Sequence, residues 1–382
     1  MYDYLIVGAG LYGAVVAHEM TKHGKSCLVI DKRLHIGGNI FTENVEGITV
    51  HRYGAHIFHT DDKEIWDYIT QFAVFNHFIN CPIAVYKDKV YNLPFNMNTF
   101  AQMWGRFITP DEAEGTIKLL AESEHITDPK NLEEQAISLV GREIYEKLIK
   151  GYTEKQWGLP CSDLPPSIIK RIPLRFTYDN NYFDDKYQGI PVGGYTQIIS
   201  RMLAGSDVLL GTDYHKMSGK RNIAYVTVYT GSIDEMYDYK YGPLDYRTLS
   251  FSTKILDKKD YQGNAVVNYT GAEVPYTRII EHKHFERGTQ SKTVITKEYP
   301  ARYVAGYSIP YYPINTEKND ALYARYMELA KADTNIVFGG RLGLYRYMDM
   351  DDTIKSALKL SKRLIEQPAG GTDGKGNKAM QG

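Results

Sequence analysis

The hydrophobic pattern at the start of the chain predicts a β-α-β unit. Residues 5–7 and 27–30 are short apolar runs without alternation, as expected for strands that are buried on both faces of a parallel sheet. The residues between them have helical spacing. Two later apolar runs, at 223–230 and 336–338, are each followed by glycine and predict two more strands of the same sheet.

The middle of the chain has a different pattern. Between residues 62 and 190 the apolar spacing is mainly helical. The sequence Thr-Pro-Asp-Glu at 109–112 is a capping box with proline at the first helical position, and Asn131 with Glu134 begins another helix. From 249 the period falls to two, which predicts strands of an antiparallel sheet at 249–255, 265–269, 277–284 and 293–299.

These elements predict an α/β protein with a discontinuous Rossmann-like domain that is interrupted by a helical insert and by an antiparallel β-sheet domain. The expected segments are 1–70, 191–233 and 331–366 for the dinucleotide-binding domain, 71–95 and 234–330 for the sheet domain, 96–190 for the helical insert with a mobile loop, and 367–382 for a disordered tail.

Composition excludes several classes of protein. The 45 Lys and Arg residues nearly balance the 46 Asp and Glu residues, so no overall field favours nucleic acid or a membrane surface. The three cysteines are far apart and form no metal-binding pattern, so no disulfide framework and no zinc or other metal site is predicted. No apolar run approaches the ~18 residues of a membrane span, and we expect a cytoplasmic protein.

The first β-α-β unit carries a dinucleotide fingerprint. Gly8 permits a tight turn, Gly10 permits close approach of a pyrophosphate, and Gly13 permits close packing of helix on strand. The start of the helix favours phosphate, and Asp31 at the end of the second strand is placed to accept from a ribose hydroxyl. This fingerprint does not separate NAD from FAD.

The next residues favour FAD. The stretch DKRLHIGGN at 31–39, with Gly38 and Asn39 at its end, resembles flavoproteins of the glutathione-reductase and amine-oxidase kind. In those proteins this loop runs along the diphosphate and ribityl of the flavin. The strand that ends at Thr230-Gly231 resembles a second flavoprotein signature, and the chain has no second GxGxxG for a separate nicotinamide dinucleotide.

Longer motifs resemble one family along almost the whole chain. They are GAHIFHT at 54–60, GYTEKQWG at 151–158, IKRIPLRFTYDNNYF at 169–183, YQGIPVGGYT at 187–196, VPYTRIIEHKHF at 274–285, PYYPIN at 310–315 and GGRLGLYRYMDM at 339–350. Together they closely resemble the bacterial UDP-galactopyranose mutases. The resemblance implies a homodimeric isomerase with FAD, UDP-galactopyranose as substrate, UDP-galactofuranose as product and a cellular reductant such as NAD(P)H. The product would serve galactofuranose-containing surface polysaccharides.

The resemblance also implies roles for particular residues. Arg171 and Arg278 would bind the diphosphate, and the loop around Arg171 would close over the substrate. The tyrosines whose hydroxyls would reach the diphosphate are Tyr182, Tyr312 and Tyr347, and Asp349 would help shape that side of the pocket. Trp157 would stack on the uracil beside Tyr152 and Thr153, and Asn268 would lie near the sugar.

On the cofactor side, the resemblance places His56 beside the isoalloxazine and Arg341 against the flavin, with Gly340 and Met350 nearby. Strand alternation predicts that His56 and His59 lie on opposite faces.

Chemistry suggests why an isomerase would need a flavin. Ring contraction requires the anomeric C1–O bond to break, and the motifs contain no serine, cysteine or carboxylate pair that is an obvious nucleophile. The N5 of reduced flavin would be one, through a covalent adduct with C1.

Two other kinds of protein share the first domain, namely a flavin oxidoreductase of the amine-oxidase type and a non-enzymatic flavin or nucleotide sensor. A mutase that also accepts the N-acetylgalactosamine nucleotide is a third alternative.

Overall fold

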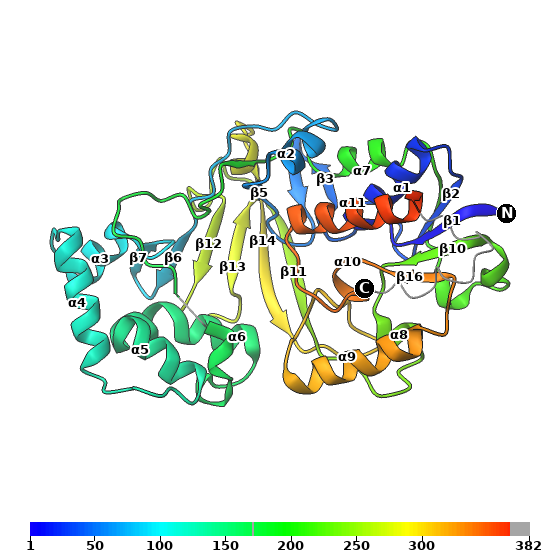
Figure 1. The fold of residues 1–382 in the computed structure, drawn as a ribbon. Coiled ribbons are helices and arrows are strands. Elements are labelled where there is room, and N and C mark those ends of the chain that lie inside the picture. Colours follow the sequence, from blue (N-terminus) through cyan, green and yellow to red (C-terminus); the bar gives the residue numbers. More distant parts are fainter. Residues whose placement is uncertain (170–171, 367–382) are drawn as a thin grey trace.

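The structure is a computed structural model that describes residues 1–169 and 172–366. Figure 1 shows three parts side by side: a Rossmann-like unit, a central sheet of long strands, and a lobe of helices on the other side of that sheet. The chain enters the Rossmann-like unit, leaves it for the sheet and the helical lobe, and returns to it twice.

A five-stranded parallel sheet forms the Rossmann-like unit. Its order is β16 (Ile336–Phe338), β10 (Ala224–Tyr229), β1 (Tyr2–Val7), β2 (Cys27–Asp31) and β9 (Asp207–Leu210). The strands predicted at 5–7, 27–30, 223–230 and 336–338 are confirmed. The hydrophobic pattern does not predict β9, because this strand lies at the sheet edge and its side chains are largely exposed.

Helices cover both faces of this sheet. One apolar core joins β1, β2 and β10 to α1 (Leu11–Lys22), α2 (Lys63–Thr70), α7 (Thr196–Met202) and α11 (Met350–Glu366). The other core includes α8 (Ile233–Met236) and α9 (Glu317–Ala330). Alternate residues of β1 enter the two cores, since Tyr4 and Ile6 belong to the first and Leu5 to the second. Burial on both faces explains the unbroken apolar runs in the sequence.

The central sheet has seven strands. Their order is β15 (Tyr312–Pro313), β11 (Tyr246–Leu256), β14 (Thr293–Ala301), β13 (Arg278–Glu281), β12 (Val266–Tyr269), β6 (Ile83–Tyr86) and β7 (Lys89–Asn92). The four predicted strands between 249 and 299 are confirmed, with small differences at their ends. The sheet is not wholly antiparallel, because β12 and β6 pair in parallel.

The helical lobe consists of α3 (Met97–Trp104), α4 (Pro110–Glu122), α5 (Leu132–Ile144), a π-helical turn at Tyr145–Lys150 and α6 (Gly151–Trp157). The capping box at the start of α4 is confirmed, and the side chain of Asn131 caps α5. α5 is kinked at Gly141, whose φ of 75° is left-handed. A Cβ there would lie 2.8 Å from the Cβ of Leu120, so the kink brings α5 close to α4.

Shorter elements connect the three parts. They are β3 (Thr42–Val45) with β4 (Ile48–His51), β5 (Phe58–Thr60) with β8 (Tyr187–Gly189), and α10 (Gly340–Gly343). No helix within 1–169 or 172–366 is both long enough and apolar enough to cross a membrane. Cys27, Cys81 and Cys161 carry free thiols.

Candidate active site

Two cavities meet in the middle of the molecule. One of about 250 Å³ lies over the carboxyl ends of β1, β2 and β10, where open α/β sheets bind ligands. The other, of about 600 Å³, is lined by residues of the central sheet, of the helical lobe and of the Rossmann-like unit. Five residues line both cavities: Asn39, His56, Tyr311, Arg341 and Met350. After the ligands that the sequence predicts, we call the smaller space the nucleotide cavity and the larger one the sugar cavity, and we call these five residues the junction.

The glycine turn gives the nucleotide cavity its floor. Gly8 has a φ of +112°, and a Cβ there would lie 2.1 Å from Oγ1 of Thr230. A Cβ on Gly13 would lie 2.0 Å from the carbonyl oxygen of Gly8, so α1 packs directly on the turn. Gly10 is the N-cap of α1 and supplies no side-chain cap. The first N–H groups of α1 therefore remain available for an anion.

Charged side chains also line the nucleotide cavity. Asp31 accepts from the backbone N–H of Ala9 and of Arg33, each at 2.8 Å, and retains lone pairs for a further donor. Arg33 donates through Nη2 to Asn39, whereas its buried Nη1 has no hydrogen-bond partner in the described part of the chain. A buried guanidinium nitrogen without a partner beside a helix N-terminus fits the diphosphate of a dinucleotide.

At the junction, His56 is held at three points. Its backbone N–H donates to Nδ1 of His51 at 3.3 Å, its carbonyl accepts from the Tyr195 hydroxyl at 3.1 Å, and its ring Nδ1 lies 2.8 Å from the Gly54 carbonyl. A carbonyl only accepts, so Nδ1 carries the proton and Nε2 carries a lone pair. Burial lowers the pKa of His56 to about 4, which Arg341 and Arg278 reinforce. His56 is therefore a neutral acceptor at pH 7.

Arg341 is the cationic residue of the junction and lies close enough to His56 to lower its pKa. Its guanidinium donates to the carbonyls of Tyr311 and Met348 and lies 5.0 Å from the ring centre of Tyr347. The left-handed Gly340 (φ +72°) begins α10, which carries Arg341. The side chain is thus fixed by the backbone around it and adds positive charge where both cavities meet.

Three polar residues form a row across the central sheet. Arg278 on β13 pairs in register with Asn268 on β12 and with Glu298 on β14, so all three side chains share one face and line the sugar cavity. Nε of Arg278 lies 3.1 Å from Oε1 of Glu298. Burial opposes the charge of Arg278, but Glu298 outweighs it and raises the pKa of the arginine. The guanidinium therefore stays charged inside the cavity.

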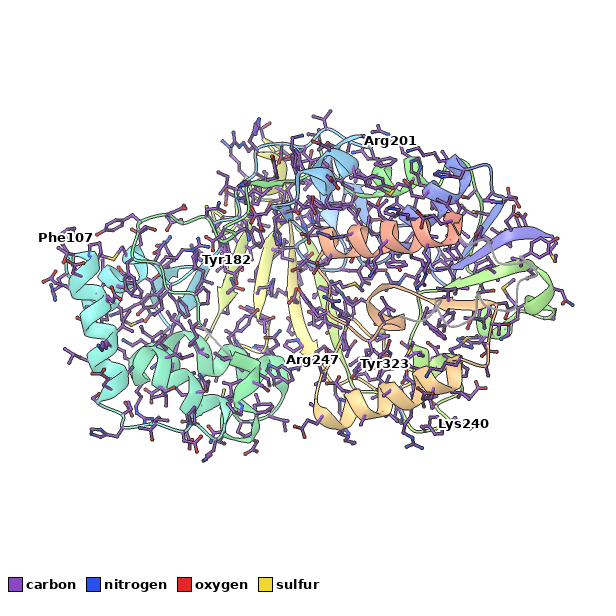
Figure 2. The ribbon with its side chains drawn as sticks, viewed as in Figure 1. Phe107, Tyr182, Arg201, Lys240, Arg247 and Tyr323 are labelled. Carbon is purple, nitrogen blue, oxygen red and sulfur yellow. The ribbon has the colours of Figure 1, made fainter. Side chains whose placement is uncertain are left out.

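Helix α6 supplies the opposite wall. The hydroxyl of Tyr152 accepts from Nη2 of Arg278 at 2.8 Å, and the indole of Trp157 lies 3.8 Å below the guanidinium of Arg247 on β11. Figure 2 labels Arg247 at the end of the sheet nearest α6. Burial lowers the pKa of Arg247 to about 10, and its buried Nη2 has no hydrogen-bond partner within residues 1–169 and 172–366. Such a cation fits an anionic ligand.

Tyrosines complete the cavity. Tyr312 is mostly buried, and burial raises its pKa to about 12, so its hydroxyl is a donor at neutral pH. Tyr347 donates to Asp349 at 3.0 Å. Tyr182, which is labelled beside β12 in Figure 2, lines the same cavity and is 44% exposed.

The structure thus brings together most residues proposed from the sequence. Of those expected to contact substrate or flavin, all line one of the two cavities except two. Thr153 lines neither cavity and is buried, because successive helical residues point about 100° apart and Tyr152 is the residue that faces the cavity. Arg171 lies outside the described residues.

One prediction about orientation is wrong. His56 and His59 line the same sugar cavity instead of opposite faces. The alternation rule fails because β5 begins only at Phe58, so His56 precedes the extended segment. His59 stacks on Phe183 at 3.7 Å and pairs with Asp185.

Sequence reasoning missed Arg247, Glu298 and Tyr311. A weak signal existed for the first two, because each is a charged residue within a run of strand character. Only the strand register places Glu298 beside Arg278. Tyr311 directly precedes the predicted Tyr312, but the sequence does not distinguish it from a tyrosine that packs in the core.

Among the described residues, Asp260, Glu281 and His284 bring possible metal ligands within 4.8 Å of one another. The carboxylate of Glu281 already accepts from two backbone N–H groups and from Thr293. We therefore describe this group as an ion-pair cluster.

Fold and cavities together define a dinucleotide-binding α/β enzyme whose second, cationic cavity suits a diphosphate ligand. Residues 147–347 match the family described as UDP-galactopyranose mutase, and residues 6–72 match the NAD(P)-binding Rossmann-like domain. The chain belongs to the UDP-galactopyranose mutase family, and the protein is an isomerase of that family.

Individual relatives agree in length with this chain. A probable UDP-galactopyranose mutase of Klebsiella pneumoniae is 42% identical over 96% of both chains. A dTDP-fucopyranose mutase of Escherichia coli is 39% identical over 96% of this chain and 99% of its own. A crystal structure of a reduced UDP-galactopyranose mutase shares the fold, with a TM-score of 0.71 at 14% identity and 96% coverage of both chains.

Proposed function

We propose that the protein converts UDP-galactopyranose into UDP-galactofuranose, with FAD in the nucleotide cavity. The observation that carries this proposal is the junction, because a dinucleotide in one cavity would meet a sugar nucleotide in the other beside His56 and Arg341. An apolar amine pocket would not need two buried arginines, Arg247 and Arg278, in its wall.

The nucleotide cavity fits FAD in three respects. The free N-terminus of α1 and the unpaired Nη1 of Arg33 suit a diphosphate, and Asp31 suits a ribose. Asn39 and Met350 would lie by the isoalloxazine ring at the junction. When bound and reduced, FAD would supply N5 as the nucleophile that displaces UDP from the anomeric carbon, without net oxidation.

The remaining work belongs to this chain's own residues. Arg278 and Arg247 would bind the diphosphate and stabilise the charge that develops when UDP leaves. The hydroxyls of Tyr312 and Tyr347 would add hydrogen bonds, and the indole of Trp157 would offer a face for the uracil. His56 would accept a hydrogen bond at Nε2, since its Nδ1 is committed to Gly54.

A second substrate has a specific observation in its favour. The Escherichia coli relative named dTDP-fucopyranose mutase is nearly as similar to this chain as the Klebsiella relative is. Both sugar nucleotides offer a diphosphate and a hexopyranose, which the cationic wall would bind alike. They differ in the base, the ribose 2′-hydroxyl and the sugar 6-hydroxyl.

The deciding experiment incubates the purified flavoprotein with each sugar nucleotide, with and without dithionite, and separates the products by chromatography. We expect UDP-galactofuranose only with reduced flavin, and no consumption of reductant per turnover. Reconstitution with 5-deaza-FAD, in which carbon replaces N5, should abolish activity. Substantial turnover with that analogue would contradict the role given to N5, and exclusive turnover of dTDP-fucopyranose would reassign the substrate.

A further inference from the structure

Lys155 is an unusual residue of α6, because its ammonium group is bound by backbone. Nζ donates to the carbonyls of Tyr269 at 2.7 Å, Gly271 at 2.8 Å and Tyr276 at 3.1 Å. These carbonyls belong to the end of β12 and to the turn that leads to β13. An ammonium has three donors, so all of them are used on one turn of the central sheet.

Neighbouring contacts attach the same helix to the same turn. A Cβ on Gly151, the first residue of α6, would lie 2.4 Å from the carbonyl oxygen of Thr270, so helix and turn touch through their backbones. The hydroxyl of Thr270 donates to the carbonyl of Lys147 at 2.7 Å. The segment from Lys147 to Lys155 therefore follows the position of this turn.

The position of α6 matters for the sugar cavity. Tyr152 lies one helical turn before Lys155, on the same side of α6, and its hydroxyl meets Arg278. Trp157 lies two residues after Lys155 and stacks with Arg247. Lys155 thus lies between Tyr152 and Trp157, which line the cavity together with Gln156 of the same helix.

The electrostatic surroundings distinguish this lysine from a surface charge. Burial lowers the pKa of Lys155 to about 8, and the exposed Glu273 only partly opposes this effect. A lysine that gives up water without gaining a paired carboxylate is costly unless its hydrogen bonds are well placed. Three backbone carbonyls at fixed positions meet that need.

We propose that Lys155 is a positioning residue: by binding the turn after β12, it holds Tyr152 and Trp157 in place to receive the nucleotide half of the substrate. This inference rests on the proposed function, because it concerns the part of the cavity assigned to the base and the diphosphate.

The test compares Lys155→Met, which keeps much of the side-chain stem and removes the donors, with Lys118→Met on α4, where the lysine is exposed. UDP binding to the FAD-loaded proteins is measured by calorimetry, together with flavin content. We expect UDP to bind at least ~10-fold more weakly to Lys155→Met, because Tyr152 and Trp157 are no longer held in place. A tenfold change corresponds to about 1.4 kcal/mol. Flavin content should be unchanged in both variants. UDP affinity within twofold of the Lys118→Met protein would overturn the proposal.

A double-mutant cycle separates positioning from general weakening. If Lys155 acts through the wall that it holds, Tyr152→Phe should weaken UDP binding much less in the Lys155→Met background than in the wild type. Full additivity of the two changes would overturn the positioning role. Should Lys155→Met not accumulate as folded flavoprotein, Lys155→Gln replaces it under the same threshold. Absence of UDP binding by the wild type would instead contradict the proposed function.

Discussion

At the scale of single residues, the sugar cavity is defined by which charges are paired. Arg278 forms an ion pair with Glu298 on the adjacent strand and donates to Tyr152, whereas Nη2 of Arg247 is buried and has no hydrogen-bond partner among the described residues. A paired arginine keeps its position without ligand, while an unpaired one gains most when an anion arrives. The two arginines should therefore respond differently to removal.

We expect Arg278→Ala to lower kcat/KM by a factor that corresponds to about 2 to 5 kcal/mol of transition-state stabilisation. The change removes a contact to phosphate and also leaves Glu298 buried without its partner. Arg247→Ala should mainly raise the UDP dissociation constant. Flavin content should be normal in both variants, and steady-state kinetics with UDP calorimetry measures the split. Near-normal kinetics in either variant would remove that arginine from the site. Arg171→Ala, predicted from the sequence alone, belongs in the same series.

Trp157 gives a separate test of the base-binding wall. Trp157→Ala should weaken UDP binding by about 1 to 3 kcal/mol, the range known for stacking of a base on an aromatic side chain. Trp157→Phe keeps a flat ring and should lose much less. Calorimetry with UDP and with inorganic pyrophosphate compares the two ligands. Equal losses for both ligands would mean that Trp157 does not contact the base.

At the scale of elements, α1 packs so closely on the glycine turn that the contact leaves no room for a side chain. Gly13→Val should give colourless, less stable protein, because a Cβ would overlap the carbonyl oxygen of Gly8. A variant with a bulky residue in place of Gly10 should also lose flavin.

Gly115→Ala is the matched control, since a Cβ added to this helical glycine of α4 would have no neighbour within 4 Å. It should stabilise the protein by about 0.5 to 1 kcal/mol in thermal unfolding. Full flavin occupancy in Gly13→Val would contradict the fingerprint interpretation.

The elements also show how far sequence pattern reaches. Buried strands such as β1 and β10 were predictable because both faces demand apolar residues, and the capping box marked the start of α4. Three other features could not be predicted from the pattern, because each depends on contacts between distant segments. They are the edge strand β9, the kink at Gly141 and the parallel pairing of β6 with β12. Arg278 could be predicted because it lies in a sequence motif. Glu298 lies outside the motifs, and only the pairing of distant strands places it beside Arg278.

At the scale of the whole molecule, a group of buried neutral histidines makes folding sensitive to acid. Burial lowers the pKa of His282 to about 3 and of His56 to about 4, and lowers the pKa of His51 well below its usual value. Below about pH 6.5 these histidines bind protons in the unfolded chain but stay neutral in the folded protein, so falling pH favours unfolding. Each unit of such a shift corresponds to about 1.4 kcal/mol.

We therefore expect the melting temperature to fall between pH 7 and pH 5. His282→Gln should lower the melting temperature at pH 7, because Thr296 loses its 2.7 Å partner, yet should flatten the dependence on pH. Calorimetric melting at matched ionic strength measures both effects. An unchanged slope in the variant would show that His282 does not contribute to acid sensitivity.

The order of strands in the parallel sheet has a consequence for synthesis of the chain. β1 emerges first from the ribosome, yet its neighbour β10 pairs Val226 with Tyr4, and β16 follows only at Ile336. Met350, which completes the junction, comes later still. The nascent chain must therefore keep its first strand exposed on one edge for most of translation. We therefore expect cofactor capture to follow synthesis of most of the chain, whereas the helical lobe, whose contacts are local in sequence, can fold well before it.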